Sequence, residues 1–231
     1  MKKEVEEKIF NILRKKHLKK IRKRIKNQNF SIICNNCVGG FIYHDLGMKF
    51  LSPTINLFMK SDDFVIFAKD IKYYCSCEVI QVKDETKNFP VGKLLAKDKE
   101  HKDIEIYFNH YDNFESAKNK WEERAKRINY NNIYIILEFY DNAYSESILE
   151  DFQAIPYENK IILTHKKYNN VKNTFAVTCY KDNKPNAQLF KYKGISGKRY
   201  LDEFDYVKFL NQKSKIQKHK FIKNISKNKV V

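Results

Sequence analysis

The segment CNNCVGG, residues 34–40, brings a thiol, two side-chain amides and two glycines close together in the sequence. Cys37 is a candidate nucleophile, because a helix N-terminus and a neighbouring histidine can activate a thiol, and the alternative is a small core residue that follows a buried strand. The two glycines would let backbone amides approach a phosphate or carboxylate, and the structural alternative is a tight turn with positive φ. Neither a Walker nor a GxGxxG pattern is present to decide between them. The substrate-binding residues expected in this segment are Asn35, Asn36, Gly39 and Gly40.

Three histidines are candidate general bases for this thiol, namely His44, His110 and His165. His110 and His165 each directly follow a predicted strand, and parallel neighbouring strands would bring both to the sheet edge that carries Cys37. His44 is adjacent to Asp45, but side chains of adjacent helical residues diverge by about 100°, so these two are expected to act separately. A surface or hydrogen-bonded structural role is the alternative for His110 and for His165.

Arg124 and Arg127 lie three residues apart in a predicted helix. Two guanidinium groups on one helical face suit a bidentate grip on a phosphate. Neighbouring glutamates and a lysine equally favour a solvent-exposed face with ion pairs. Lys93, in the segment FPVGK, allows the same two interpretations.

The five cysteines occur in a chain without a recognisable export signal, which indicates reduced thiols rather than a disulfide framework. Cys34 and Cys37 form a CxxC pair, and Cys75 and Cys77 form a CxC pair. Tetrahedral zinc sites usually separate paired ligands by about two to four residues, which the second pair does not do. We therefore predict no metal site, and the sequence identifies no cofactor.

The formal net charge of +17 is concentrated at the two ends of the chain. Residues 1–28 carry 12 Lys and Arg against 3 Glu, and residues 212–231 carry 7 Lys and no acid. Residues 29–211 are close to neutral, so a nucleic-acid partner is not expected. The predicted organisation is a basic amphipathic helix or tail over 1–28, an α/β domain over 29–211, and a basic tail over 212–231.

Apolar residues recur at roughly helical spacing among the lysines of the N-terminal segment. They are Val5, Ile9, Ile12, Leu13, Leu18, Ile21 and Ile25. Such a helix could lie on an anionic membrane surface or dock on the domain, and compositional bias is the plainer alternative. No stretch is apolar enough to span a bilayer. We expect a cytoplasmic protein, and peripheral contact with the inner membrane face is left open.

Strands and helices alternate along the domain without a linker or an internal repeat. Strands are predicted at 30–34, 52–58, 78–82, 104–108, 133–139, 160–164 and 174–180, with a loop over 89–102. Helices are predicted at 41–47 with Gly47 as its end, from Ser61, from Asp112 in the capping box DNFE, from Ser145 and over 199–211. This rhythm predicts one three-layer α/β/α domain with a mostly parallel or mixed sheet.

A set of longer strings covers nearly the whole domain, from about residue 30 to 211. In order they are SIICNNCVGGFIYHDLG, FLSPTINLF, FNHY, KWEERAKRIN, IPYENKIILTH and FDYVKFLN. Together they resemble the bacterial family known as domain of unknown function 1919, whose members are often labelled exopolysaccharide biosynthesis proteins. The specific elements are NNC-x-GG-x-x-Y and Trp-x-x-Arg-x-x-Arg-Ile-Asn. Cys34 departs from the pattern, in which we expect Ser, so a CxxC redox or metal role would be peculiar to this chain.

The resemblance implies an α/β fold and a link to the assembly of capsule, lipopolysaccharide or exopolysaccharide. The implied activity is that of a transferase with an activated sugar or acyl donor and a polysaccharide acceptor. The alternative is a non-catalytic accessory protein that binds a polysaccharide intermediate or a partner enzyme at the inner membrane face, so whether the chain is an enzyme stays open. Through the two specific elements and their neighbours, Tyr43, Asp45 and Trp121 join the expected substrate-binding residues.

Overall fold

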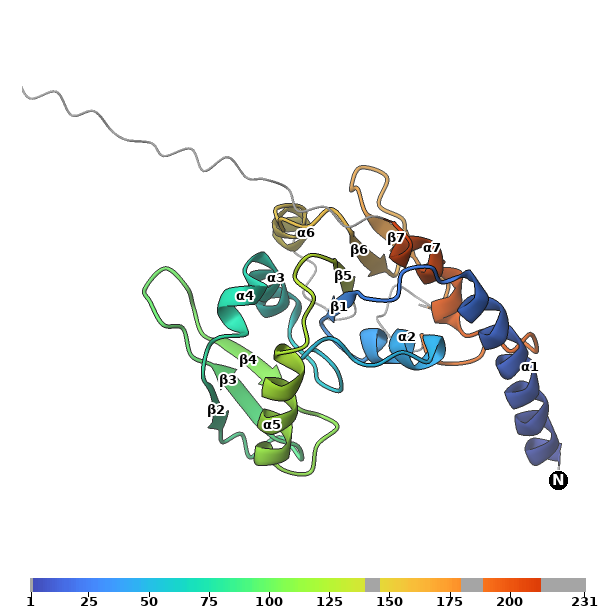
Figure 1. The fold of residues 1–231 in the computed structure, drawn as a ribbon, viewed down its shortest axis with the longest axis horizontal. Coiled ribbons are helices and arrows are strands. Elements are labelled where there is room, and N and C mark those ends of the chain that lie inside the picture. Colours follow the sequence, from blue (N-terminus) through green and yellow to red (C-terminus); the bar gives the residue numbers. More distant parts are fainter. Residues whose placement is uncertain (1, 140–145, 180–188, 213–231) are drawn as a thin grey trace, which may run out of the picture.

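Apolar runs of the chain form a parallel sheet with the strand order β1-β5-β6-β7 (Figure 1). The strands are β1 (Ser31–Cys34), β5 (Ile133–Glu138), β6 (Lys160–Thr164) and β7 (Thr174–Ala176). All residues of β1 and β5 are buried, as expected for parallel strands that are covered on both faces. This computed structural model describes residues 2–139, 146–179 and 189–212.

Three further strands form a separate antiparallel sheet in the order β2-β3-β4. They are β2 (Val79–Val82), β3 (Val91–Leu94) and β4 (Ile104–Tyr107). The prediction of a loop over 89–102 is therefore wrong for residues 91–94, which form β3. Gly92 in β3 allows a close approach, because a Cβ there would lie 2.7 Å from Cε2 of Phe108. The α/β class is confirmed, but the strands divide between two sheets.

A short extended segment links the two sheets. Phe58 pairs with Tyr107 of β4 through backbone hydrogen bonds of 2.8 and 2.9 Å. The next residue, Met59, donates its N–H to the carbonyl of Asn35 at 2.8 Å, directly after β1. The strand predicted over 52–58 is thus reduced to one bridge at Phe58. This bridge holds the end of β4 beside the end of β1.

Helices cover both faces of the parallel sheet. They are α1 (Lys2–Arg24), α2 (Val38–Leu46), α3 (Ser61–Lys69), α4 (Ile71–Tyr74), α5 (Phe114–Ala125), α6 (Glu146–Gln153), the 3-10 helix η1 (Tyr200–Glu203) and α7 (Tyr206–Leu210). Ile33 belongs to a core shared with α3, α5, α6 and the antiparallel sheet. Its neighbour Ile32 belongs to a second core shared with α1, α2 and α7. Successive side chains of β1 point to opposite faces of the sheet, so each face is covered by its own apolar core.

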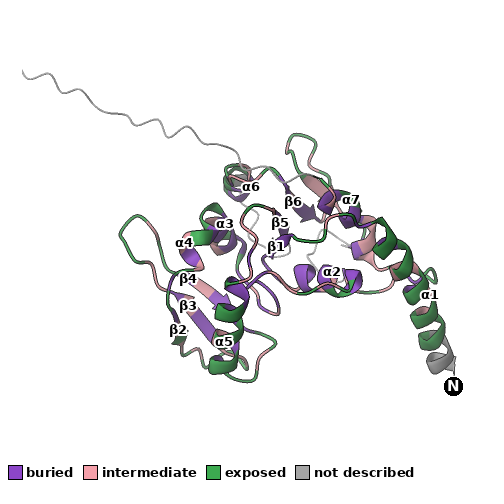
Figure 2. Cartoon of the chain, in the orientation of Figure 1, coloured by how far each residue is buried: buried purple, intermediate pink, exposed green. Residues whose placement is uncertain are grey.

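The N-terminal helix α1 is largely exposed, yet it docks on the domain (Figure 2). Ile21 in the last turns of α1 and Ile25 just after the helix are both buried in the second core. Helix α1 also packs against α2. The hairpin before η1 also contacts α1, because a Cβ at Gly197 would lie 2.5 Å from the backbone carbon of Leu13. Gly197 has a φ of +71°, which glycine adopts most readily. The N-terminal segment was predicted either to lie on a membrane surface or to dock on the domain, and in the structure it docks on the domain.

Several helix boundaries differ from the predicted ones. Helix α5 is capped by Asn113, whose side chain accepts the N–H of Ser116, and not by Asp112. Helix α3 begins at Ser61, with Lys60 in the N-cap position. The helix predicted over 199–211 is divided into η1 and α7, and Ser145 lies outside the described residues. Gly47 ends α2 in the left-handed conformation, as predicted. Within the described residues no helix combines the length and the apolar character that crossing a membrane requires.

Candidate functional site

The Cys37 thiol and the His110 imidazole form a direct contact, with 3.0 Å between Sγ and Nε2. Cys37 follows β1 and occupies the N-cap position of α2, so its side chain lies at the positive end of that helix dipole. His110 follows β4. At this distance the thiol can donate its proton to the imidazole, which is the arrangement a nucleophile and its general base require.

The route by which His110 reaches Cys37 differs from the predicted one. The prediction had neighbouring parallel strands carry both residues, but β4 belongs to the antiparallel sheet. The Phe58–Tyr107 bridge brings the end of β4 to the segment after β1 instead. The expected proximity is found, and the reason given for it was wrong.

Cys37 and His110 both line a cavity of about 330 Å³. Its lining comes from α2, the segment after it, the residues after β4 and the C-terminal part of the chain. The lining residues are Cys37, Gly40, Phe41, His44, Phe50, Asn56, His110 and Arg199. The volume is at the lower end of the range for small-molecule sites. Phe41, Phe50, Asn56 and Arg199 were not predicted from the sequence as site residues.

The environment of Cys37 favours a neutral thiol at rest. Burial raises its pKa to about 11, and the negative charge of Glu138 contributes to the increase. Cys34 lies deeper, and burial raises its pKa to about 12. Reaction at Cys37 therefore depends on a base that removes its proton as the new bond forms, which is the role that His110 can fill.

The two asparagines that precede Cys37 fix the backbone rather than facing the cavity. The Asn35 side chain accepts the N–H of Glu138 at 2.9 Å and donates to its carbonyl at 3.0 Å. The Asn36 amide donates to the Glu138 carboxylate, and its oxygen accepts the N–H of Val38 at 3.0 Å. These bonds hold the segment after β1 to the end of β5. Glu138, which is buried, was not predicted; an acid that ends the apolar run IYIILE was its only sequence signal.

Both glycines lie inside α2, so the tight turn with positive φ is wrong. A Cβ at Gly39 would lie 3.3 Å from Cγ2 of Ile32, and one at Gly40 would lie 3.4 Å from Cγ2 of Ile55. Their small size lets the first turn of α2 pack closely on β1 and on the segment after α2. Gly40 also lines the cavity.

Tyr43 and Trp121 are core residues. The Tyr43 hydroxyl donates to the carbonyl of Phe30 at 2.9 Å and accepts the N–H of Ile32 at 3.0 Å. Trp121 is buried, with its ring 5.9 Å from that of Phe67. Neither side chain is part of the cavity lining.

Arg124 of α5 and Arg127, which follows the end of α5, have separate partners and do not form a joint phosphate grip. Arg124 donates to the carbonyl of Ile55 at 3.0 Å and to the Tyr111 hydroxyl at 2.9 Å. Arg127 pairs with Glu123 on the surface of the helix. Arg124 also lies over the ring of the cavity residue Phe50, at 5.5 Å from its centroid, so it supports the cavity from outside.

Lys93 and His165 lie outside the cavity lining. Lys93 is on β3, 4.0 Å from Asp103, and lines a different hollow. His165 follows β6, where burial and then the charge of Lys166 lower its pKa. Among the residues that the structure describes, no group of three or more His, Cys, Asp or Glu side chains is placed to hold a metal ion.

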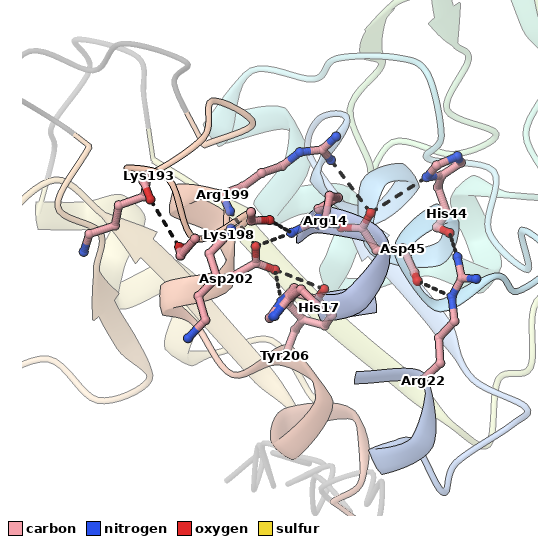
Figure 3. Close-up of polar contacts among 12 residues, drawn as sticks. Arg14, His17, Arg22, His44, Asp45, Lys193, Lys198, Arg199, Asp202 and Tyr206 are labelled. Carbon is pink, nitrogen blue, oxygen red and sulfur yellow. Dashed lines mark hydrogen bonds and ion pairs between the residues drawn. The ribbon is translucent and has the colours of Figure 1, made fainter. Parts of the chain in front are cut away.

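A buried ionic network joins α1, α2 and η1 (Figure 3). Arg14 of α1 pairs with both Asp45 of α2 and Asp202 of η1. Burial lowers the pKa of Arg14, but the two carboxylates outweigh this effect and leave the pKa above its ordinary value. Asp45 is thus a buried residue that pairs with Arg14, and it does not line the cavity as a substrate-binding residue would. The exposed His44 has Nδ1 3.8 Å from Asp45 Oδ1, which is too long for a hydrogen bond but within reach of an ion pair when the histidine is charged.

The sequence of the chain matches one known protein family over a range that includes the cavity. Residues 8–211 match the family described as domain of unknown function (DUF1919). The chain is also 35% identical over 191 residues to an uncharacterized protein of Haemophilus influenzae, covering 83% of this chain and 88% of that protein. Every residue that lines the cavity falls inside the matched family region.

Proposed function

Because the chain belongs to the DUF1919 family, and the family match contains the whole cavity, we propose that this cavity is the active site of an acyltransferase. The reaction passes through a thioester on Cys37. The observation that carries the proposal is the 3.0 Å contact between Cys37 Sγ and His110 Nε2. A thiol with a base at hydrogen-bond distance is suited to acyl transfer through a covalent intermediate.

The first half-reaction loads the acyl group. Cys37 Sγ attacks the carbonyl carbon of an activated acyl donor while His110 Nε2 takes the thiol proton. The bond between that carbon and the leaving group then breaks, and the leaving group takes the proton from His110. A thioester on Cys37 and the protonated leaving group are the products.

The second half-reaction unloads it. An acceptor hydroxyl gives its proton to His110, and its oxygen attacks the thioester carbon. The bond to Sγ breaks, the sulfur regains the proton from His110, and an ester is released. No oxidant or reductant is needed, and the thiol and imidazole return to their starting states.

Acyl transfer is favoured over glycosyl transfer by the chemistry of the lining. The lining residues that the structure describes include a thiol and imidazoles but no carboxylate. A thiol paired with an imidazole can accept an acyl group as a thioester and release it again, which is the chemistry of covalent acyl transfer. The family resemblance supports a hydroxyl of a surface polysaccharide or its precursor as the acceptor. The competing proposal is a non-catalytic accessory protein of polysaccharide assembly that uses the cavity for binding alone.

The proposal is tested by trapping the intermediate. Purified protein is incubated with a series of acyl-coenzyme A thioesters and analysed by intact-protein and peptide mass spectrometry. We expect an adduct of one acyl group on the Cys37 peptide that neutral hydroxylamine removes, as it does a thioester. Cys37→Ala should give no adduct, whereas Cys75→Ala, which removes a half-buried thiol elsewhere, should be acylated like the wild type. A Cys37 that stays unmodified by every donor would favour the accessory role.

Helix α1 supports a peripheral position on an anionic membrane. Ile9 and Ile12 remain 48% and 55% exposed on this helix, surrounded by lysines, although Ile21 and Ile25 are buried. Exposed apolar side chains next to basic ones are the pattern of interfacial helices. The proposed location is therefore the inner membrane face, where polysaccharide precursors would be met.

Vesicle binding tests this location. The full chain should co-sediment with vesicles that contain phosphatidylglycerol and not with vesicles of phosphatidylcholine alone. Replacing Ile9 and Ile12 together by serine should weaken the binding about tenfold or more, because two buried apolar side chains are lost from the interface. Equal binding of the wild type and the double variant would mean that α1 does not insert.

A further inference from the structure

The C-terminal part of the chain contributes an arginine to the cavity lining, and this arginine lies between aromatic rings. Arg199 directly precedes η1 and lines the cavity together with Cys37 and His110. Its guanidinium carbon lies 5.1 Å from the ring centroid of Phe41 and 5.8 Å from that of Tyr192. Aromatic contacts hold the plane of a guanidinium while leaving its N–H groups available for hydrogen bonds.

The hydrogen-bonding capacity of Arg199 is not used up by the described part of the chain. Its Nε and Nη1 atoms are buried and have no hydrogen-bond partner there. The carboxylate of Asp45 lies 3.8 Å from Nη1, close enough to balance charge but too far for a hydrogen bond. Asp45 is already bonded to Arg14, as Figure 3 shows. Buried donors without acceptors are costly, so an incoming anion would relieve that cost with a small movement of the side chain.

The rest of the lining adds to the attraction for negative charge. His44, His110 and Arg199 line the cavity, and no carboxylate is among its described lining residues. Cys37 is the N-cap residue of α2 and Gly40 lies in its first turn, so both are at the positive end of the helix dipole. The cavity lining thus combines a charged arginine, a helix N-terminus, two phenylalanines and the Cys37 thiol.

From this arrangement we infer that the cavity contains an anion subsite centred on Arg199, which binds a phosphate or carboxylate group of the substrate next to Cys37. The substrate assignment rests on the proposed acyl transfer, whereas the anion site itself does not. The anion would belong either to the phosphate-bearing carrier of the acyl donor or to an acidic sugar of the acceptor. Arg199 is then a binding residue that orients the substrate toward the thiol.

The experiment compares the alkylation of Cys37 by two reagents that differ in charge. Iodoacetate is an anion and iodoacetamide is its neutral counterpart, and both convert the thiol to a thioether with release of iodide. The rate at Cys37 is followed by peptide mass spectrometry, so the other four cysteines do not interfere. Arg199→Gln should lower the ratio of the iodoacetate rate to the iodoacetamide rate about tenfold, because a close charge–charge attraction is lost. Arg24→Gln, which removes an exposed arginine of α1, should leave the ratio unchanged.

A second measurement uses the unaltered protein, in case Arg199→Gln fails to fold. Inorganic phosphate should slow the alkylation of wild-type Cys37 by iodoacetamide more than chloride does at equal ionic strength. Glucuronate is tested in parallel: stronger protection by phosphate assigns the anion to the donor, and stronger protection by glucuronate assigns it to the acceptor. An unchanged reagent ratio in Arg199→Gln, or no protection by either anion, overturns the subsite. If the ratio responds and no acyl adduct ever forms on Cys37, the anion subsite stands and the acyltransferase proposal fails.

Discussion

Replacing His110 by alanine should slow the acylation of Cys37 by p-nitrophenyl acetate about 10²- to 10⁴-fold, the usual contribution of a general base. The reason is the pKa of the Cys37 thiol, which burial raises to about 11, so that little thiolate is present at neutral pH. Release of p-nitrophenol follows the reaction without requiring the natural donor. His101→Ala is a matched control, because this histidine lies at the opposite end of β4, stacked on Tyr73. A His110→Ala rate within about twofold of the wild type would exclude His110 as the base.

The pH dependence separates a base from a merely structural histidine. Without His110, only thiolate formed by ionisation can react, and below a pKa of about 11 its fraction rises with pH. The His110→Ala rate should therefore increase about tenfold per pH unit from pH 7 to pH 10. The wild-type rate should rise less steeply, because His110 removes the proton during the attack. Parallel profiles for the two proteins would contradict this role.

The second large effect is on stability. Replacing Arg14 by methionine should lower the free energy of unfolding by about 3 to 5 kcal/mol, since it removes the cation that bridges two buried carboxylates, Asp45 and Asp202, and leaves only the longer contact of Arg199 with Asp45 and that of His17 with Asp202. Arg24→Met is the matched control on the same helix. Its partner Asp205 is exposed, so the expected loss is only about 0 to 1 kcal/mol. Urea denaturation measures both, and equal losses for the two variants would show that the Arg14 network contributes no more than a surface pair.

Much of the parallel sheet could be predicted because its strands are encoded locally. The runs FSIIC and IYIILEF are unbroken and rich in β-branched residues, which is typical of strands buried on both faces. Strand β3 was missed because Gly92 and Lys93 interrupt any apolar pattern. Its place in a sheet depends on pairing with β2 and β4 and on the close approach of Phe108, and neither contact is visible in the sequence around it.

The candidate site was predictable in part for the same physical reason. Cys37 follows a locally encoded strand, and the expectation that ligands bind beyond the carboxyl ends of strands drew attention to it. His110 was found for the wrong reason, since the bridge at Phe58 was not predicted. Arg199 is one of 45 Lys and Arg residues, and only its place in the lining of the same cavity as Cys37 distinguishes it. Asp45 was expected to bind substrate, but it pairs with Arg14 of the segment that was predicted as a basic amphipathic helix or tail.

The order in which the chain is synthesised gives the position of Arg199 a further consequence. When β1, β4 and β5 have emerged from the ribosome, Cys37 and His110 can already meet, but Arg199 has still to be translated. A nascent chain at that stage would contain the proposed nucleophile and base without the arginine of the proposed anion subsite. The proposed anion subsite is therefore completed last, when Gly197 packs against α1 and Asp202 pairs with Arg14.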